Sequence, residues 1–341
     1  MATRNAATYK DIQRITGLSL ATISKFYNGG NVLAANRGLI EAAAESLSYR
    51  VNANASSLRR GTSGTVGVLL PTLLNAFHLL VIVGVEKHLR EQGISVLVSS
   101  NEGESARGAS NALDVLLGRQ VDGIIAVPAA SDLDALARAA ESGIPVVTID
   151  WWEEGLHADS VSLDNVDAGW VVGQHIVDHG HQQIGILAGD QSISTMRERR
   201  DGFIRALTHN GRTITDDLIM TGPLTVDSGY SNTMQLLASH SRPTVLFAAN
   251  YDLTVGALIA INESGLRLGA DISMVGFDSV ELSRVTRPNL TILAQPIDAI
   301  AEVAARTMKT RIEENGQPSS FTKERIPGTL IVGASVASLH E

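Results

Sequence analysis

The sequence predicts a small helical head followed by an α/β core of two doubly wound parallel sheets. Near the N-terminus, two short segments with helical apolar spacing flank a Gly-Leu-Ser turn, which is typical of a helix-turn-helix. From Gly64 onward, short continuous apolar runs alternate with helical segments, as expected for strands that are buried on both faces. The length of 341 residues suits two or three domains.

The helix-turn-helix is expected within residues 9–28. Gly17 supplies the permissive backbone of a tight turn, and the Ser19 hydroxyl can cap the second helix. The free face of that helix carries small, hydroxyl and basic residues, as a helix in a DNA major groove would: Leu20, Ala21, Thr22, Ser24 and Lys25. On these residues alone, an ordinary helical hairpin stays open as an alternative.

A third amphipathic segment follows, around Leu39, Ile40 and Ala43. The next stretch, from Tyr49 to Gly61, is mostly small and polar, so it cannot bury enough apolar surface to form a stable helix alone. We therefore expect a DNA-binding domain over residues 1–48, a hinge or flexible linker over residues 49–62, and a core over residues 63–341.

The expected strands of the core are short apolar runs without polar alternation. They are Val66–Leu70, Ile94–Val98, Gly123–Val127, Val146–Ile149, Ile184–Ala188, Val245–Ala248 and Ser273–Phe277. Helical segments between them would cover both faces of each sheet, and about ten such units would fill two lobes.

The charge of the chain is divided between its parts. Residues 1–62 hold eight Lys/Arg and three Asp/Glu and carry +5, whereas the remainder carries −14 within a total of −9. A basic head on an acidic body is expected when only the head contacts phosphates. The chain has no cysteine and its N-terminus shows no apolar signal region, which favours a cytoplasmic protein.

Several motifs resemble the lactose/purine repressor (LacI/GalR) family of transcription regulators. In the head they are Tyr9-Lys10-Asp11-Ile12, Gly17-Leu18-Ser19, Ala21-Thr22-Ile23-Ser24-Lys25, Asn28-Gly29, Tyr49, Asn52-Ala53, Ala55 and Ser57-Leu58-Arg59. In the core they are VDGII, GIPVV, HGHQQIGILAG, FAAN and MVGFD, in the family's order. The resemblance covers nearly the whole chain and is therefore specific.

This resemblance implies a DNA-binding repressor with a periplasmic-binding-protein-like core and a small-molecule effector, most simply a sugar or sugar derivative. It places lobe 1 at about residues 63–160 and 292–325, and lobe 2 at about 161–291 and 326–341. The hinge would fold on DNA, with Leu58 wedged between base pairs in the minor groove. Beyond the helix face given above, the implied DNA contacts are Asn28, Tyr49, Asn52, Ala55 and Leu58.

The segment Ala76–Leu89 is apolar nearly all round, which predicts a partner surface for this helix. The family resemblance implies that the helix lies in a homodimer interface, and a two-fold dimer would read a near-palindromic operator. A helix that is fully buried inside one subunit is the alternative.

Ligands of open α/β sheets bind beyond the carboxyl ends of the strands. Polar or aromatic residues that follow the apolar runs are therefore candidate ligand residues: Asn75, Phe77, His78, Asn101, Asp150, Trp151, Trp152, Asp190, Asn250 and Asp278. From these we predict a ligand site of Phe77, His78, Asp150, Trp151, Asn250 and Asp278, and the family resemblance supports all of them except Asp150. The resemblance adds Arg199 to this set. Carboxylates and indole rings suit polyhydroxylated ligands. His78 and Tyr251 depart from the family pattern, which leaves the identity of the ligand open.

The sequence offers little support for other chemistry. His175, His179 and His181 could suggest zinc, but no HExxH motif is present, and we expect no metal, cofactor or catalytic residue. An exported solute-binding protein and a sugar-processing enzyme such as a kinase are the competing interpretations. Residues 1–60 argue against the first, and the lack of a phosphate-binding loop argues against the second.

Overall fold

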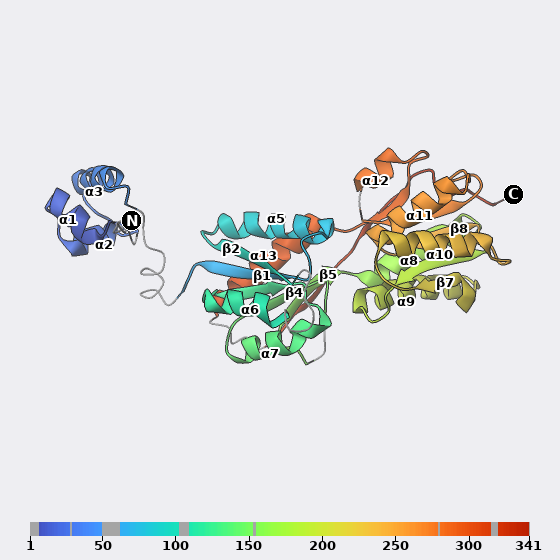
Figure 1. Ribbon diagram of the computed structural model, residues 1–341, viewed down its shortest axis with the longest axis horizontal. Helices are drawn as coiled ribbons and strands as arrows, with labels where there is room; N and C mark the ends of the chain where they lie inside the picture. The colour runs from blue at the N-terminus through green and yellow to red at the C-terminus, as the bar shows by residue number, and fades with distance from the viewer. Residues whose placement is uncertain are drawn as a thin grey trace, which may run out of the picture. The chain divides into compact units, whose positions relative to one another are not determined.

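The structure is a computed structural model that describes residues 7–27, 29–49, 62–101, 109–152, 155–278, 280–314 and 320–340. The chain divides into two compact units, Met1–Ser63 and Gly64–Glu341 (Figure 1). We describe each unit by itself.

The described residues of the first unit form three helices, α1 (Tyr9–Thr16), α2 (Leu20–Tyr27) and α3 (Ala34–Ser46). Each helix contributes one fully buried isoleucine to the small core: Ile12, Ile23 and Ile40. Gly17 ends α1 with a φ of 69°, a left-handed conformation that glycine adopts without steric cost. The Ser19 hydroxyl accepts a hydrogen bond of 3.1 Å from the Thr22 backbone N–H. Both turn residues therefore act as the sequence predicts.

Apolar spacing does not by itself separate buried from exposed residues in this unit. Ile15 and Leu39 are 55% and 51% exposed, although they are apolar and lie close in the sequence to the buried Ile12 and Ile40. Three short helices enclose a narrow core, so each helix buries only the stripe nearest its neighbours.

Lobe 1 of the second unit is a six-stranded sheet in the order β11-β5-β4-β3-β1-β2, with every neighbouring pair parallel. Its strands are β1 (Thr65–Leu70), β2 (Ser95–Ser100), β3 (Gly123–Ala126), β4 (Val146–Ile149), β5 (Asp159–Leu163) and β11 (Lys323–Ile326). The helical segments of this lobe are α5 (Ala76–Arg90), α6 (Ala109–Gly118), η1 (Ala130–Asp132), α7 (Leu133–Glu141) and α13 (Ile297–Glu313). Helices α5 and α13 cover one face, and α6 and α7 cover the other.

Lobe 2 is a second six-stranded sheet in the order β12-β10-β9-β8-β6-β7, in which β12 is antiparallel to β10. Its strands are β6 (Ile184–Gly189), β7 (Ile219–Thr221), β8 (Val245–Ala248), β9 (Ser273–Phe277), β10 (Thr291–Ala294) and β12 (Thr329–Ile331). The helical segments are α8 (Asn165–Asp178), α9 (Ser194–His209), η2 (Asp216–Leu218), α10 (Val226–Ala238), α11 (Tyr251–Glu263) and α12 (Val280–Val285). Helices α8 and α9 pack on one face, and α10 and α11 on the other.

The chain crosses between the lobes three times, at Asp164, at Gln295-Pro296 and at Pro327-Gly328. The limits expected at residues 160/161, 291/292 and 325/326 fall inside strands β5, β10 and β11, and so require correction. Strand β11 belongs wholly to the first sheet, because it pairs with β5 along its length. Strand β5 belongs wholly to the first sheet and β10 to the second, because each pairs along its length with strands of that sheet.

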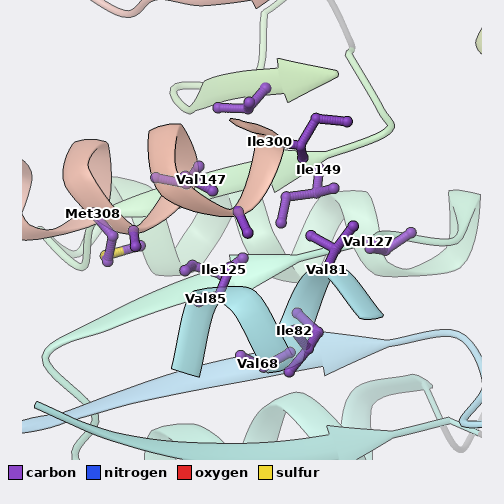
Figure 2. Close-up of a cluster of buried hydrophobic side chains, with 14 of the residues drawn as sticks. Val68, Val81, Ile82, Val85, Ile125, Val127, Val147, Ile149, Ile300 and Met308 are labelled. Carbon is purple, nitrogen blue, oxygen red and sulfur yellow. The ribbon is translucent and has the colours of Figure 1, made fainter. Parts of the chain in front are cut away.

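The apolar segment Val66–Val85 contributes to two elements, β1 and α5. Figure 2 shows Val81, Ile82 and Val85 of α5 within the apolar cluster to which α13 contributes Ile300 and Met308. In the part of the chain that the structure describes, no helix is both long enough and apolar enough to span a membrane.

Only part of α5 is buried within the subunit. Leu79, Leu80 and Val83 are 39%, 54% and 66% exposed, and they lie on the same helix as the buried Val81 and Val85. The alternative that this helix is fully buried inside one subunit is therefore wrong.

Candidate ligand-binding cleft and nucleic-acid interface

Helix α2 presents a mixed surface that runs from its first residue to Lys25 in its last turn. Leu20, Ala21 and Lys25 are exposed, whereas Thr22 and Ser24 are half-buried. The Thr22 hydroxyl lies 2.9 Å from that of Ser19, so it also takes part in the turn that starts the helix. This face offers an apolar side chain, hydroxyl groups and a cation, which are the groups that read base edges and phosphates.

Tyr49 is the other predicted DNA contact that the structure describes. Its ring packs against Tyr9 and Tyr27, with ring centroids 5.8 and 5.3 Å apart, so it is half-buried in an aromatic cluster of the head. The remaining predicted contacts lie outside the described residues: Asn28, Asn52, Ala55 and Leu58.

Asp150 and Trp151 stand where β4 ends. The Trp151 carbonyl oxygen accepts hydrogen bonds of 2.8 Å from the hydroxyls of Thr148 and Ser160, which fixes the turn after the strand. Asp150 adopts a positive φ of 55°. Burial raises the pKa of its carboxyl to about 6, although the Arg199 guanidinium opposes this shift.

Arg199 reaches from α9 toward Asp150 and is almost completely buried. Its Nη2 lies 4.0 Å from Asp150 Oδ1, its Nε donates to Asn165 Oδ1 at 2.8 Å, and its Nη1 donates to the Ala249 carbonyl oxygen at 2.8 Å. The guanidinium also stacks over the Phe277 ring at 3.9 Å. Thus Arg199 is held on one side by lobe 2, while its charge faces the carboxylate of lobe 1.

Asn250 and Asp278 follow strands β8 and β9, as the strand-end argument predicts. The Asn250 side chain accepts a hydrogen bond of 3.0 Å from the Leu253 N–H, so it caps α11. Asp278 has a φ of 75° and accepts a hydrogen bond of 2.5 Å from Gln295 Nε2. Burial raises the pKa of Asp278, while Arg199 and Gln295 lower it. Asn250 therefore caps a helix, whereas the Asp278 carboxylate interacts electrostatically with the Arg199 guanidinium.

Phe77 and His78 lie in the first turn of α5, with ring centroids 5.6 Å apart. His78 is buried, and this burial lowers its pKa to about 4, so the imidazole is neutral at pH 7. Its Nδ1 makes no hydrogen bond to any residue that the structure describes.

A cavity of about 410 Å³ opens between the lobes. Its walls come from lobe 1 (Leu74, Asn75, Ala76, Phe77, Leu80, Ile297), from lobe 2 (Tyr251, Asp252, Asp278, Val280, Glu281, Ala294) and from the crossover residue Gln295. Of the predicted ligand residues, Phe77 and Asp278 line it. His78, Asp150, Trp151, Arg199 and Asn250 lie outside its lining. The structure thus divides the predicted set into an open apolar part and a buried polar cluster around Arg199.

Among the residues that the structure describes, several buried polar atoms make no hydrogen bond, including Asp150 Oδ1, Trp151 Nε1, Gln191 Oε1, Thr195 Oγ1 and Gln295 Oε1. Such atoms are costly unless a ligand or water pairs with them. Sequence reasoning missed Asn165, Gln191, Thr195 and Gln295. Gln191 and Thr195 follow β6, so the strand-end rule could have found them, whereas Asn165 and Gln295 stand at the crossovers between the lobes.

Two of the three histidines considered for zinc make hydrogen bonds within lobe 2. His181 Nδ1 lies 2.8 Å from the Thr244 hydroxyl and its Nε2 lies 3.1 Å from the Ala337 carbonyl oxygen, while His179 Nδ1 bonds the His175 carbonyl oxygen at 2.8 Å. Among the residues that the structure describes, no group of three potential ligands could hold a metal ion.

Comparison with known proteins agrees with this architecture. Residues 63–324 match the family described as periplasmic binding proteins and sugar binding domain of LacI family. The HTH-type transcriptional repressor PurR of Pasteurella multocida (strain Pm70) is 31% identical over 313 residues, which cover 91% of this chain and 93% of that relative. The ribose operon repressor of Haemophilus influenzae is 30% identical, with coverage of 98% and 99%.

Among solved structures, the Lac repressor dimer bound to operator and the anti-inducer ONPF superposes with a TM-score of 0.86. It is 28% identical in sequence, and the match covers 98% of this chain and 100% of that one. A three-helix head followed by a two-lobed α/β core defines a class of transcription regulators. This chain belongs to the LacI family of that class, and its relatives are named as repressors, not enzymes.

Proposed function

We propose that this regulator is a sequence-specific repressor whose affinity for an operator is controlled by a small polyhydroxylated effector bound between the lobes. The observations that carry the proposal are the buried ion pair of Arg199 with Asp150 and the buried carboxylate, indole and hydroxyl atoms that make no hydrogen bond to the described residues. A bacterial protein that binds DNA works in the cytoplasm, and we propose this location for the regulator.

The chemistry of the cluster favours a neutral sugar or sugar derivative. Asp150 and Asp278 accept hydrogen bonds from hydroxyl groups, Arg199 donates them, and the Trp151 ring can pack against sugar C–H groups. A flat purine base is the rival ligand, because Phe77 could stack on it and its ring nitrogens could pair with the same polar atoms. The PurR relative makes this rival worth testing.

A thermal-shift screen of the full chain against sugars, sugar phosphates, nucleosides and purine bases tests the effector class. Stabilisation by a carbohydrate supports the proposal, because a ligand that binds only the folded state raises its stability by mass action. Stabilisation by purines alone would replace the sugar with a nucleobase and leave the rest of the proposal intact. No response to any member would contradict the proposed effector class.

Asp278→Ala is expected to abolish the effector response and to leave operator affinity without effector nearly unchanged. The carboxylate interacts electrostatically with Arg199 in lobe 2, and the head is a separate compact unit. The measurement is an operator titration with and without the sugar found in the screen. A variant that still responds fully would remove Asp278 from the site, and one that loses operator binding outright would point to a structural role.

For the head, we propose that α2 reads the major groove through Leu20, Ala21 and Lys25. Exchanging Leu20 and Ala21 is expected to change operator preference by about 1–3 kcal/mol for each altered base pair, because Leu20 offers only apolar contact, for instance to a thymine methyl. Binding-site selection with wild type and the exchanged variant measures this. If both return the same consensus, α2 is not the recognition helix.

We propose a homodimer that pairs through the exposed face of α5 and reads a near-palindromic operator. The support is the apolar surface of Leu79, Leu80 and Val83, beside a groove of about 620 Å³ that α5 shares with the start of α13. A solved relative is described as a dimer on its operator. Apolar side chains on one face of a helix are stabilised when a second copy covers them.

A further inference from the structure

Two ion pairs of opposite polarity join the lobes, and they start from adjacent residues of α9. Arg199 points its guanidinium toward Asp150 of lobe 1, as described above. Its neighbour Glu198 accepts a hydrogen bond of 3.1 Å from Arg325 Nη2, so here lobe 2 supplies the anion and lobe 1 the cation.

Arg325 is well placed to hold α9 at a fixed position relative to the first sheet. It lies in the edge strand β11, directly opposite Ser162 of β5, and its Nη1 donates to the Ser162 hydroxyl. Both strands end within a few residues and continue into lobe 2. Any change in lobe angle that turns about these two crossovers must therefore change the distance between Arg325 and α9.

Asn165 connects the two ion pairs. Its Oδ1 accepts from Arg199 Nε at 2.8 Å, and its Nδ2 donates to the Leu163 carbonyl oxygen at 3.0 Å and lies 3.5 Å from Glu198 Oε2. Asn165 is fully buried at the first crossover. The side chains of Arg325 and Glu198 are 20% and 27% exposed, so solvent screens their attraction less than it screens a surface pair.

We propose that Glu198 and Arg325 are positioning residues that form an ionic strap between the lobes and fix the lobe angle at which Arg199 faces Asp150. The strap acts through the lobes themselves and needs no ligand. Only one consequence of the strap rests on the proposed function. The lobe angle that the strap sets would determine how well an effector fits both lobes.

The test is a distance measurement between the lobes in the ligand-free full chain. The chain has no cysteine, so Arg138→Cys on α7 and Gln235→Cys on α10, both at exposed positions, give one spin label in each lobe without competing thiols. Labelled chains diluted with excess unlabelled protein report the distance within a subunit by pulsed electron resonance. The doubly labelled protein without further changes is the background. It is compared with the same labelled protein that carries Glu198→Gln, Arg325→Gln, both substitutions, or Glu313→Gln as a control.

Glu313 pairs with Lys309 at 3.7 Å within α13. Glu313→Gln therefore makes the same charge change as Glu198→Gln, at a place away from the lobe boundary. We expect both strap variants to broaden the distance distribution, the double variant to be no broader than either single one, and the control to match the background. Salt at 1 M should broaden the background in the same way and leave the double variant unchanged, because it shortens the screening length to about 3 Å.

Identical distributions in the background and in the strap variants would overturn the strap, whatever the effector proves to be. A loss of thermal stability without any change in distance would assign the pair a purely local role and would also overturn it. Because no effector is present in this experiment, a failed carbohydrate screen and a failed strap are separate results.

Discussion

Gly202→Ala is expected to destabilise lobe 2 by about 3 kcal/mol or more, an effect at the upper end for the addition of one methyl group. A Cβ at this position of α9 would lie under 3.0 Å from the backbone carbonyl of Val166 on α8. Backbone atoms cannot move aside as a flexible side chain can. The two helices would have to separate, and α9 carries both Arg199 and Glu198.

Gly169 makes the reciprocal close approach, because a Cβ there would meet the backbone of Arg199 and Phe203. The two glycines thus let α8 and α9 pack backbone to backbone, and this packing brings Asn165 at the start of α8 within reach of Arg199. We therefore expect any folded Gly202→Ala protein to bind the effector more weakly as well.

Chemical unfolding monitored by intrinsic tryptophan fluorescence, to which Trp170 of α8 contributes together with Trp151 and Trp152, measures the change in stability. Gly118→Ala is the matched control, since Gly118 is exposed at the end of α6 and has no atom within 4 Å of an added Cβ. Its substitution should leave the core unchanged or stabilise it by less than about 1 kcal/mol. Equal stabilities of the Gly202 variant and wild type would show that α8 and α9 are not in tight contact.

Much of the fold could be predicted from the sequence, because most strands that are buried on both faces are apolar along their length. Strand β5 is an exception that the apolar pattern missed, since it is fully buried although it contains Asp159, Ser160 and Ser162. The runs ending at Leu70, Ile149 and Phe277 are strands in the structure. The limits of the lobes were less accurate, since the sheet to which β10 belongs depends on its pairing with β9 and not on its own residues. In the head, apolar spacing could not distinguish the buried Ile12 from the exposed Ile15.

For the candidate site, the positions of Asp150 and Asp278 could be predicted because each residue directly follows one strand, β4 or β9. The site was not predictable where two crossovers meet. Asn165 and Gln295 carry no motif, and their roles arise from contacts with Arg199 and Asp278, at separations of 34 and 17 residues along the chain. The division between a polar cluster and an apolar cavity likewise depends on how the lobes face each other.

Asp150→Asn is expected to stabilise the ligand-free protein near pH 7.5. It is also expected to weaken effector binding at least about tenfold, because one charge-assisted hydrogen bond to the effector is lost. Burial raises the pKa of Asp150 to about 6 from an ordinary value of 3.8, so its ionised form is unfavourable in the folded state. For an acid with a raised folded pKa, the contribution to stability falls as pH rises from about 4 to 6 and is level above that. Removing the charge should recover a free energy of unfolding on the order of 3 kcal/mol or less above pH 6, and almost none below pH 4.

Asp159→Asn is the matched comparison and should have the opposite sign. This aspartate is also buried in lobe 1, but Arg311 binds both of its oxygens at 2.7 and 2.8 Å, and Thr322 donates to it through its backbone and its hydroxyl. These partners lower the pKa of Asp159 despite its burial, so its carboxylate stabilises the fold above the unfolded pKa, and this contribution is lost as pH falls. Asp159→Asn should therefore cost about 3 kcal/mol at pH 7.5, because it leaves Arg311 without its main partner.

Urea unfolding of wild type and both variants between pH 4 and 8 measures these differences, and the carbohydrate identified by the thermal-shift screen reports binding. A gain in stability together with a loss of binding at Asp150 would mark a residue kept for a ligand, because folding alone would favour its neutral form. If Asp150→Asn instead destabilised the protein as Asp159→Asn should, the attraction to Arg199 would outweigh the cost of burial. Asp150 would then serve mainly to hold the two lobes together.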